Sequence, residues 1–136
     1  MKRRIFVIAI CFTLSACWFK VTPVRYDEER VSAAAATGRF VTLFNEQMFE
    51  AIYAMTDERA KATKSKSALI EILSGLREDR GKILNLDRED SLGKPGDGYI
   101  EVTLRFKVKF ERSENHMTFV WYVSGGEAKL FSISVE

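Results

Sequence analysis

The chain has 136 residues, of which 46% are apolar, including ten phenylalanines, which is enough to build the core of one domain. Three of the 21 basic residues and none of the 19 acidic residues lie within residues 1–16. Residues 17–136 therefore hold 18 basic and 19 acidic side chains, a formal net charge of −1. This balance does not support a basic nucleic-acid-binding face, so we expect no nucleic acid among the partners.

The chain begins with a basic stretch, Lys2-Arg3-Arg4, followed by an apolar run from Ile5 to Thr13. A membrane-spanning helix needs roughly 20 apolar residues, whereas the apolar part of an export signal has about 7 to 15. The run ends in Leu14-Ser15-Ala16-Cys17, an aliphatic residue, two small residues and a cysteine. This order resembles a bacterial lipoprotein signal, and the resemblance implies cleavage between Ala16 and Cys17 and lipidation of the Cys17 sulfur.

The alternatives are a plain secretory signal with a chance cysteine, or an uncleaved anchor. Cys11 fits the lipidation pattern poorly, because Ile10 before it is not small. Lipidation would make membrane lipid a partner through acylated Cys17. By resemblance to enterobacterial sorting, Trp18 in place of aspartate implies the outer membrane, with the protein facing the periplasm. That rule varies between bacteria, so the inner membrane stays open.

These features divide the chain into a signal peptide (1–16), a lipidated tether (17–26) and a single α+β domain (27–136). The domain would have no thiol left for a disulfide, because Cys11 leaves with the signal and Cys17 carries lipid. Its stability must then come from an apolar core.

Helical patterns fill the first half of the domain. We expect helices over about 27–44 and 47–56, with a break at Asn45-Glu46-Gln47, and a polar loop over 56–66. The next helix should run from Ser67 as N-cap to Gly81 as stop. Its apolar residues share one face at helical spacing: Leu69, Ile72, Leu73 and Leu76.

After Gly81 the apolar period changes to two, which is typical of strands. We expect strands over 82–89, 100–110, 116–124 and 129–135, with turns at 95–98, 111–115 and Gly125-Gly126. Strand 100–110 should bury one face, and strand 116–124 is apolar on both faces, as in a central strand. In the last strand, Phe131, Ile133 and Val135 should share a face.

Helices followed by strands joined through hairpins predict an α+β fold, with N-terminal helices on a curved four-stranded antiparallel sheet. The order of elements between Phe40 and Val135 resembles the nuclear transport factor 2-like cone, also found in ketosteroid isomerases and small envelope proteins. A cystatin-like domain with one main helix is the alternative fold.

In such a cone, the open end can hold an apolar ligand. By resemblance, candidate pocket residues are Tyr53, Asp57 and Tyr122. We see no carboxylate base with a donor pair at matching positions, as a ketosteroid isomerase needs. The preferred interpretation makes Tyr53 and Tyr122 core residues with exposed hydroxyls.

Other chemistry finds little support. His116 is the single histidine and no thiol remains, so we expect no metal site and no cofactor. Gly-x-Ser-x-Gly does not occur, and Gly93 to Gly98 does not form a phosphate loop.

Arg105, Lys107 and Lys109 form a basic row on one strand face. They either dock an anionic partner or pair with acids such as Glu101 and Glu127 on a solvated sheet.

We therefore expect a membrane-anchored envelope lipoprotein whose non-catalytic domain binds a small apolar ligand or an envelope protein. The alternative is a small enzyme that uses an apolar cone pocket. A purely structural role also stays open.

Overall fold

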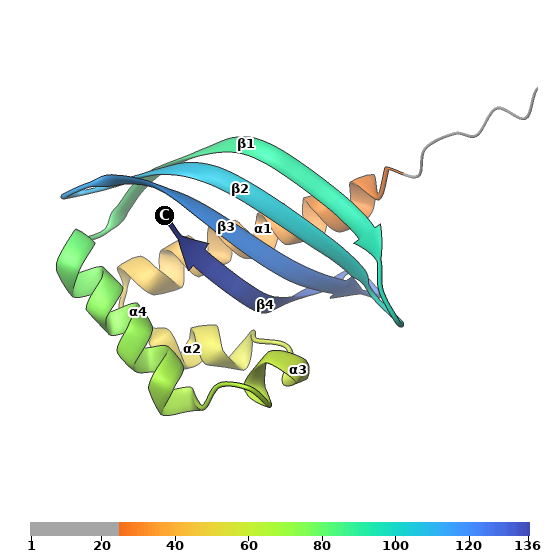
Figure 1. Cartoon of the computed structure of the whole chain (residues 1–136), viewed down its shortest axis with the longest axis horizontal. Helices are drawn as coiled ribbons and strands as arrows, with labels where there is room; N and C mark the ends of the chain where they lie inside the picture. The colour runs from red at the N-terminus through yellow and green to blue at the C-terminus, as the bar shows by residue number, and fades with distance from the viewer. Residues whose placement is uncertain (1–24) are drawn as a thin grey trace, which may run out of the picture.

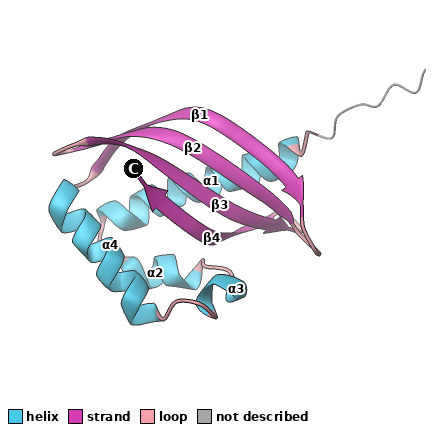
Figure 2. Cartoon of the chain, in the orientation of Figure 1, coloured by secondary structure: helices cyan, strands magenta, loops and turns pink. Residues whose placement is uncertain are grey.

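The computed structural model describes residues 25–136. The predicted signal (1–16), the Ala16–Cys17 cleavage site and the tether through residue 24 lie outside the described residues. The domain is α+β, as predicted: helices pack on an antiparallel four-stranded sheet with strand order β1-β2-β3-β4 (Figures 1 and 2). The first helix, α1 (Asp27–Asn45), crosses all four strands on the concave face of the sheet (Figure 1).

Helix α1 supplies one side of the core. Its small residues Ala33 and Ala36 let the sheet approach, and Phe40 and Phe44 fill the space beyond them. The Phe40 ring meets Phe119 edge-on at 5.1 Å between centroids, which is a favoured arrangement of aromatic rings. The helix ends where predicted, because Gln47 takes a left-handed φ of 59° that no helix continues.

Helices α2 (Phe49–Ala54), α3 (Glu58–Lys61) and α4 (Lys66–Arg80) follow α1. The predicted loop over 56–66 was wrong in part, because Asp57 accepts a hydrogen bond from the Arg59 N–H and starts the short α3. The predicted N-cap of α4 was also wrong. Ser65, and not Ser67, accepts the Ala68 N–H, so the helix starts before the predicted position.

The strands are β1 (Ile83–Pro95), β2 (Ile100–Phe110), β3 (Glu114–Ser124) and β4 (Glu127–Val135). β1 is longer than predicted, since it stays paired with β2 up to Pro95 and bulges twice on the way. The alternation of β2 is confirmed, with Val102, Leu104, Phe106, Val108 and Phe110 buried.

The predicted shared face of β4 was wrong. Trp121 lies opposite Leu130 but Val120 lies opposite Ser132, so Phe131 is an extra residue, a β-bulge. The bulge turns Phe131 to the outer face, where it stacks on Tyr122, while Ile133 and Val135 lie across from the core residues Phe119 and Met117.

Candidate functional site

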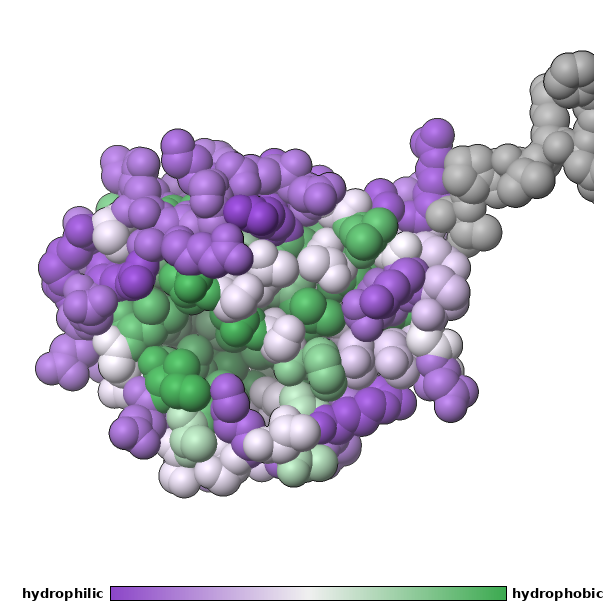
Figure 3. Space-filling view, viewed as in Figure 1, coloured by the Kyte–Doolittle hydropathy of each residue, from purple (hydrophilic) through white to green (hydrophobic). Residues whose placement is uncertain are grey.

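An open apolar groove lies between α4 and the free edge of β4. Its cavity volume is about 600 Å³, within the range of small-molecule sites. Figure 3 shows it as a hollow lined by apolar side chains and rimmed by polar ones. The lining comes from α2 to α4 and from β4: Tyr53, Thr56, Ala60, Thr63, Lys64, Leu69, Ile72, Leu73, Gly75, Leu76, Asp79, Arg80, Leu130, Phe131, Ser132, Ile133 and Val135.

The helical wall of the groove follows from the apolar stripe of α4. Leu69, Ile72, Leu73 and Leu76 recur at helical spacing, yet only Leu73 is fully buried. Ile72 is 52% exposed. The helix packs mainly on α2 and stands away from β4, so part of its apolar face has no partner among the described residues. Unpaired apolar surface of this kind marks binding sites more often than scattered apolar residues do.

The position of α4 is fixed at its C-terminal end. Gly81 ends the helix with a φ of 82°, and a Cβ there would come within 2.8 Å of the Glu111 Cβ. The Arg112 guanidinium, from the β2–β3 turn, donates to the carbonyls of Glu78 and Asp79. These carbonyls have no partner within the helix, so Arg112 ties the end of α4 to the β2–β3 turn.

The strand wall of the groove is the outer edge of β4, and Leu130 on this edge already pairs with another segment of the chain. The Leu130 N–H donates to the Met55 carbonyl at 2.9 Å, and the Leu130 carbonyl accepts from the Asp57 N–H at 2.8 Å. The segment around Thr56 thus runs beside β4 as a short parallel bridge. It turns away at Asp57 into α3 (Figure 1). The rest of the edge, from Leu130 to Val135, lines the groove.

The groove holds little acid–base chemistry. Among the described residues that line it, Asp79 carries the only carboxylate. That side chain is 77% exposed, and its oxygen lies 3.6 Å from the Arg80 Nε. A general acid or base works best in a site shielded from water, whereas Asp79 lies at the exposed rim.

The structure separates the three candidate pocket residues. Tyr53, on α2, lines the groove, and the Lys61 Nζ lies 5.0 Å from the centre of its ring. Asp57 and Tyr122 line a smaller, more polar hollow of about 290 Å³ next to the β1–β2 and β3–β4 turns. The three residues therefore do not form one pocket.

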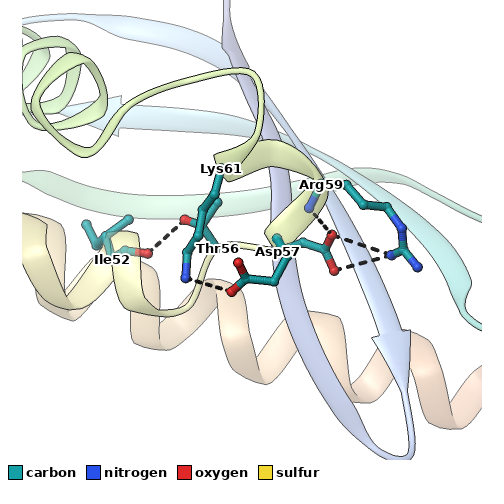
Figure 4. Close-up of polar contacts among 6 residues, drawn as sticks. Ile52, Thr56, Asp57, Arg59 and Lys61 are labelled. Atoms are coloured by element: carbon teal, nitrogen blue, oxygen red, sulfur yellow. Dashed lines mark hydrogen bonds and ion pairs between the residues drawn. The ribbon is translucent and has the colours of Figure 1, made fainter.

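The Asp57 carboxylate makes its contacts within α3. It caps α3 through the Arg59 N–H and lies 3.4 Å from the Arg59 guanidinium (Figure 4). Next to it, the buried Thr56 hydroxyl donates to the Ile52 carbonyl, and Lys61 pairs with Glu58 (Figure 4). These contacts hold the α2–α3 junction in the shape that pairs with Leu130.

Tyr122 lies in a stack of rings on the outer face of the sheet. Tyr99 is 4.0 Å from it on one side and Phe131 is 4.3 Å on the other, between ring centroids. The Arg59 guanidinium covers the Tyr99 ring at 4.4 Å. Burial, followed by the neighbouring Tyr99 hydroxyl and the Glu101 carboxylate, raises the pKa of Tyr122 to about 12. The stack covers both faces of the ring, which leaves no platform for a ligand.

The predicted basic row is partly neutralised. Arg105 lies 3.6 Å from Glu89 and 3.3 Å from Glu136, and Lys107 lies 3.9 Å from Glu114. Of the predicted acidic partners, Glu101 pairs with Lys94 instead. For Lys109, the facing residues in register are Asn85 and Glu114. The row is therefore interleaved with acids rather than a continuous cationic surface.

Within residues 25–136, no three histidine, aspartate or glutamate side chains come together in a way that would hold a metal ion. In the same part of the chain, none of the helices combines the length and apolar character that crossing a bilayer requires. No protein-family model matches the chain, and comparison with curated protein sequences finds no relative.

Sequence reasoning missed most of the groove. It identified the stripe on α4 and the apolar residues of β4 as single faces, but did not place the two beside a common groove. The sequence held no clear signal of the groove, because the stripe of α4 has the spacing of a helix that packs on a core, and distant residues decide which part of it stays uncovered.

Proposed function

We propose that this chain is a lipid-anchored envelope protein whose domain is a non-catalytic binding module of nuclear transport factor 2-like architecture. The observation that carries the binding role is the open apolar groove between α4 and β4. An apolar cavity with a few polar groups at its rim is the usual form of a ligand site. The exposed, ion-paired Asp79 offers no dry acid or base, so binding is favoured over catalysis.

The cone architecture is supported by the way the sheet curves over α1 and by the three helices that follow it (Figure 1). A cystatin-like domain with one main helix would leave the end of the sheet bare. Here α2, α3 and α4 stand at that end and form one wall of the groove.

The anchor is supported by the sequence Leu14-Ser15-Ala16-Cys17 after a basic and apolar start. We place the protein at the outer membrane facing the periplasm, held by acyl chains on Cys17. A domain tethered so close to a membrane meets apolar ligands and other envelope proteins, which are the partners that an apolar groove would take.

The binding role is tested with the Ile72→Lys variant and an environment-sensitive apolar dye. Ile72 is half exposed in the groove, so lysine there can extend to water without unfolding the helix. Its charge and lost apolar area should weaken dye binding by about tenfold or more, measured by fluorescence titration. The matched control is Leu92→Lys, a leucine 58% exposed on β1, at the other edge of the sheet.

Equal dye affinities of the wild type and both variants would contradict a binding role for the groove. Unchanged circular dichroism of both variants shows that the comparison concerns the groove and not folding.

A further inference from the structure

The edge of β4 inside the groove carries backbone groups that no described residue pairs. Glu136 exchanges both of its backbone hydrogen bonds with His116 on β3. In an antiparallel pair of strands, residues whose backbone N–H and C=O face the neighbouring strand alternate with residues whose N–H and C=O face away from it. Ser134 therefore points its N–H and C=O to β3, while those of Ile133 and Val135 point away from it, toward α4 and the groove.

We propose, building on the proposed binding role, that the groove binds an extended peptide segment of a partner protein, which adds a strand to β4 at Ile133 and Val135. Such β-strand addition gives affinity through main-chain hydrogen bonds and specificity through alternate side chains. The proposal names the class of ligand that the groove takes: polypeptide with apolar residues at every second position.

The chain itself shows that this edge accepts a backbone. Met55 and Asp57 already pair with both polar groups of Leu130. The partner segment would continue this pairing past the point where the chain turns into α3. A strand advances about 3.3 Å per residue, so a segment of about five residues covers the edge from the end of the bridge to Val135.

The side-chain surroundings match such a segment. Residues on one face of the added strand would meet the apolar wall of α4, including Leu69, Ile72 and Leu76. Residues on its other face would lie next to Ser132 and Ser134, on the outer side of the sheet. A segment that alternates apolar and polar residues satisfies both faces.

The unpaired backbone also argues against an acyl chain as occupant. A hydrocarbon in the groove would take water away from the N–H and C=O groups of Ile133 and Val135 and offer them no partner. Burying unpaired polar groups is costly, whereas a peptide backbone replaces each lost water with a hydrogen bond.

The test uses the domain in its full chain and a library of synthetic peptides in which valine, isoleucine or leucine alternates with polar residues. The best binder is compared with the same peptide N-methylated at alternate amides. This change keeps every side chain but removes the donors that would face β4. We expect N-methylation on the pairing side to weaken binding by about tenfold or more, and methylation on the other side to have little effect.

The matched protein variants are Ile133→Pro and Ile133→Ala. Proline removes the N–H that faces the groove and is tolerated on an edge strand at such a position, while alanine removes the side chain and keeps the N–H. We expect proline to weaken peptide binding by about tenfold relative to alanine. Amide hydrogen exchange on the wild type should show protection of Ile133 and Val135 when peptide is bound, which remains informative if the proline variant does not fold.

Two results would overturn the proposal while the binding role of the groove stands. One is dye or fatty-acid binding that Ile72→Lys weakens, with no peptide bound or with both methylated peptides bound equally. The other is a concentration-dependent dimer that Ile133→Pro abolishes, which would make a second copy of this chain the occupant. Failure of dye and peptides alike would count against the binding role itself.

Discussion

At the scale of single residues, one buried hydrogen bond links α1 to the centre of the sheet. The Trp121 Nε1–H donates to the Thr37 hydroxyl at 3.0 Å, and that hydroxyl donates in turn to the Ala33 carbonyl at 2.9 Å. Both side chains are buried. The pair adds a directional contact to the apolar packing of Ala33, Ala36 and Phe40 against the sheet.

Thr37→Val should lower the free energy of unfolding by about 1–3 kcal/mol, since valine keeps the shape but leaves the buried indole N–H without a partner. Denaturant titration followed by circular dichroism measures the change. Thr37→Ser is the control, because serine keeps the hydroxyl. A loss from Thr37→Ser as large as that from Thr37→Val would show that the methyl group, and not the hydrogen bond, is what matters.

Tyr122 should make the stability of the domain depend on pH in the alkaline range. Its pKa is about 12 in the folded protein and 10.0 ordinarily, so folding favours the protonated phenol. This contribution is complete below the ordinary value, and it is lost as the pH rises through the interval up to about 12. Tyr122→Phe, which keeps the ring in its stack, should lose less stability than the wild type between pH 10 and 12, measured by denaturant titration. Equal losses of unfolding free energy in the wild type and in Tyr122→Phe would contradict a raised pKa of Tyr122 in the folded protein.

At the scale of elements, the start of α4 depends on one hydroxyl. Ser65 accepts the Ala68 N–H at 3.2 Å, and Ser67 lies inside the first turn of the helix. We expect Ser65→Ala to reduce stability by about 0.5–2 kcal/mol and Ser67→Ala to change it little. Thermal unfolding of both variants measures the difference. A larger loss of stability from Ser67→Ala would indicate that Ser67 is the N-cap, as the sequence predicted.

At the contact between α1 and β1, the Asn45 side chain makes the two hydrogen bonds to the Ile83 backbone that a neighbouring strand would make. The Asn45 amide donates to the Ile83 carbonyl at 2.9 Å and accepts the Ile83 N–H at 2.8 Å. Arg77 of α4 also reaches the Asn45 carbonyl. Three elements therefore meet at Asn45, and the end of α4 that forms the groove is positioned relative to the sheet through this residue.

At the scale of the whole molecule, the start of the domain and the strand wall of the groove lie at opposite edges of the sheet, on β1 and on β4. Tyr26 packs on Gly93, where an added Cβ would come within 2.9 Å of its ring. The strand wall of the groove lies on β4, with Leu130 in the same register row as Trp121, Val102 and Gly93. The groove and Tyr26 are therefore separated across the sheet, from one edge strand to the other, and not along the strands.

Cys17→Ser should release the protein from the membrane fraction into the periplasm, because acyl chains contribute about 0.8 kcal/mol per buried methylene and two or three chains anchor firmly. Fractionation of cells that express each form measures the distribution. Mass spectrometry of the N-terminal peptide should find the lipid on Cys17 of the wild type. A bare Cys17, or membrane retention of the serine variant, would contradict the anchor.

Local pattern was enough to predict α1, the long strands and the meander. The alternation from Ile100 to Phe110 is a property of neighbouring residues, and so is the stop at Gly81. The same reasoning misplaced Phe131, because the bulge opposite Val120 depends on how two strands align. It grouped Tyr53 with Asp57 and Tyr122, whereas Tyr53 lines the groove and the other two line a separate, smaller hollow.

The sequence by itself determined the α+β class and the order of the elements apart from α3, because both are encoded in residues close together along the polypeptide. Only the tertiary structure decided that α4 stands away from β4 and leaves its apolar stripe and the β4 edge facing a groove. That separation is set by contacts between distant residues, above all those of Asn45, Arg112 and Leu130, and no local pattern records which distant partners meet.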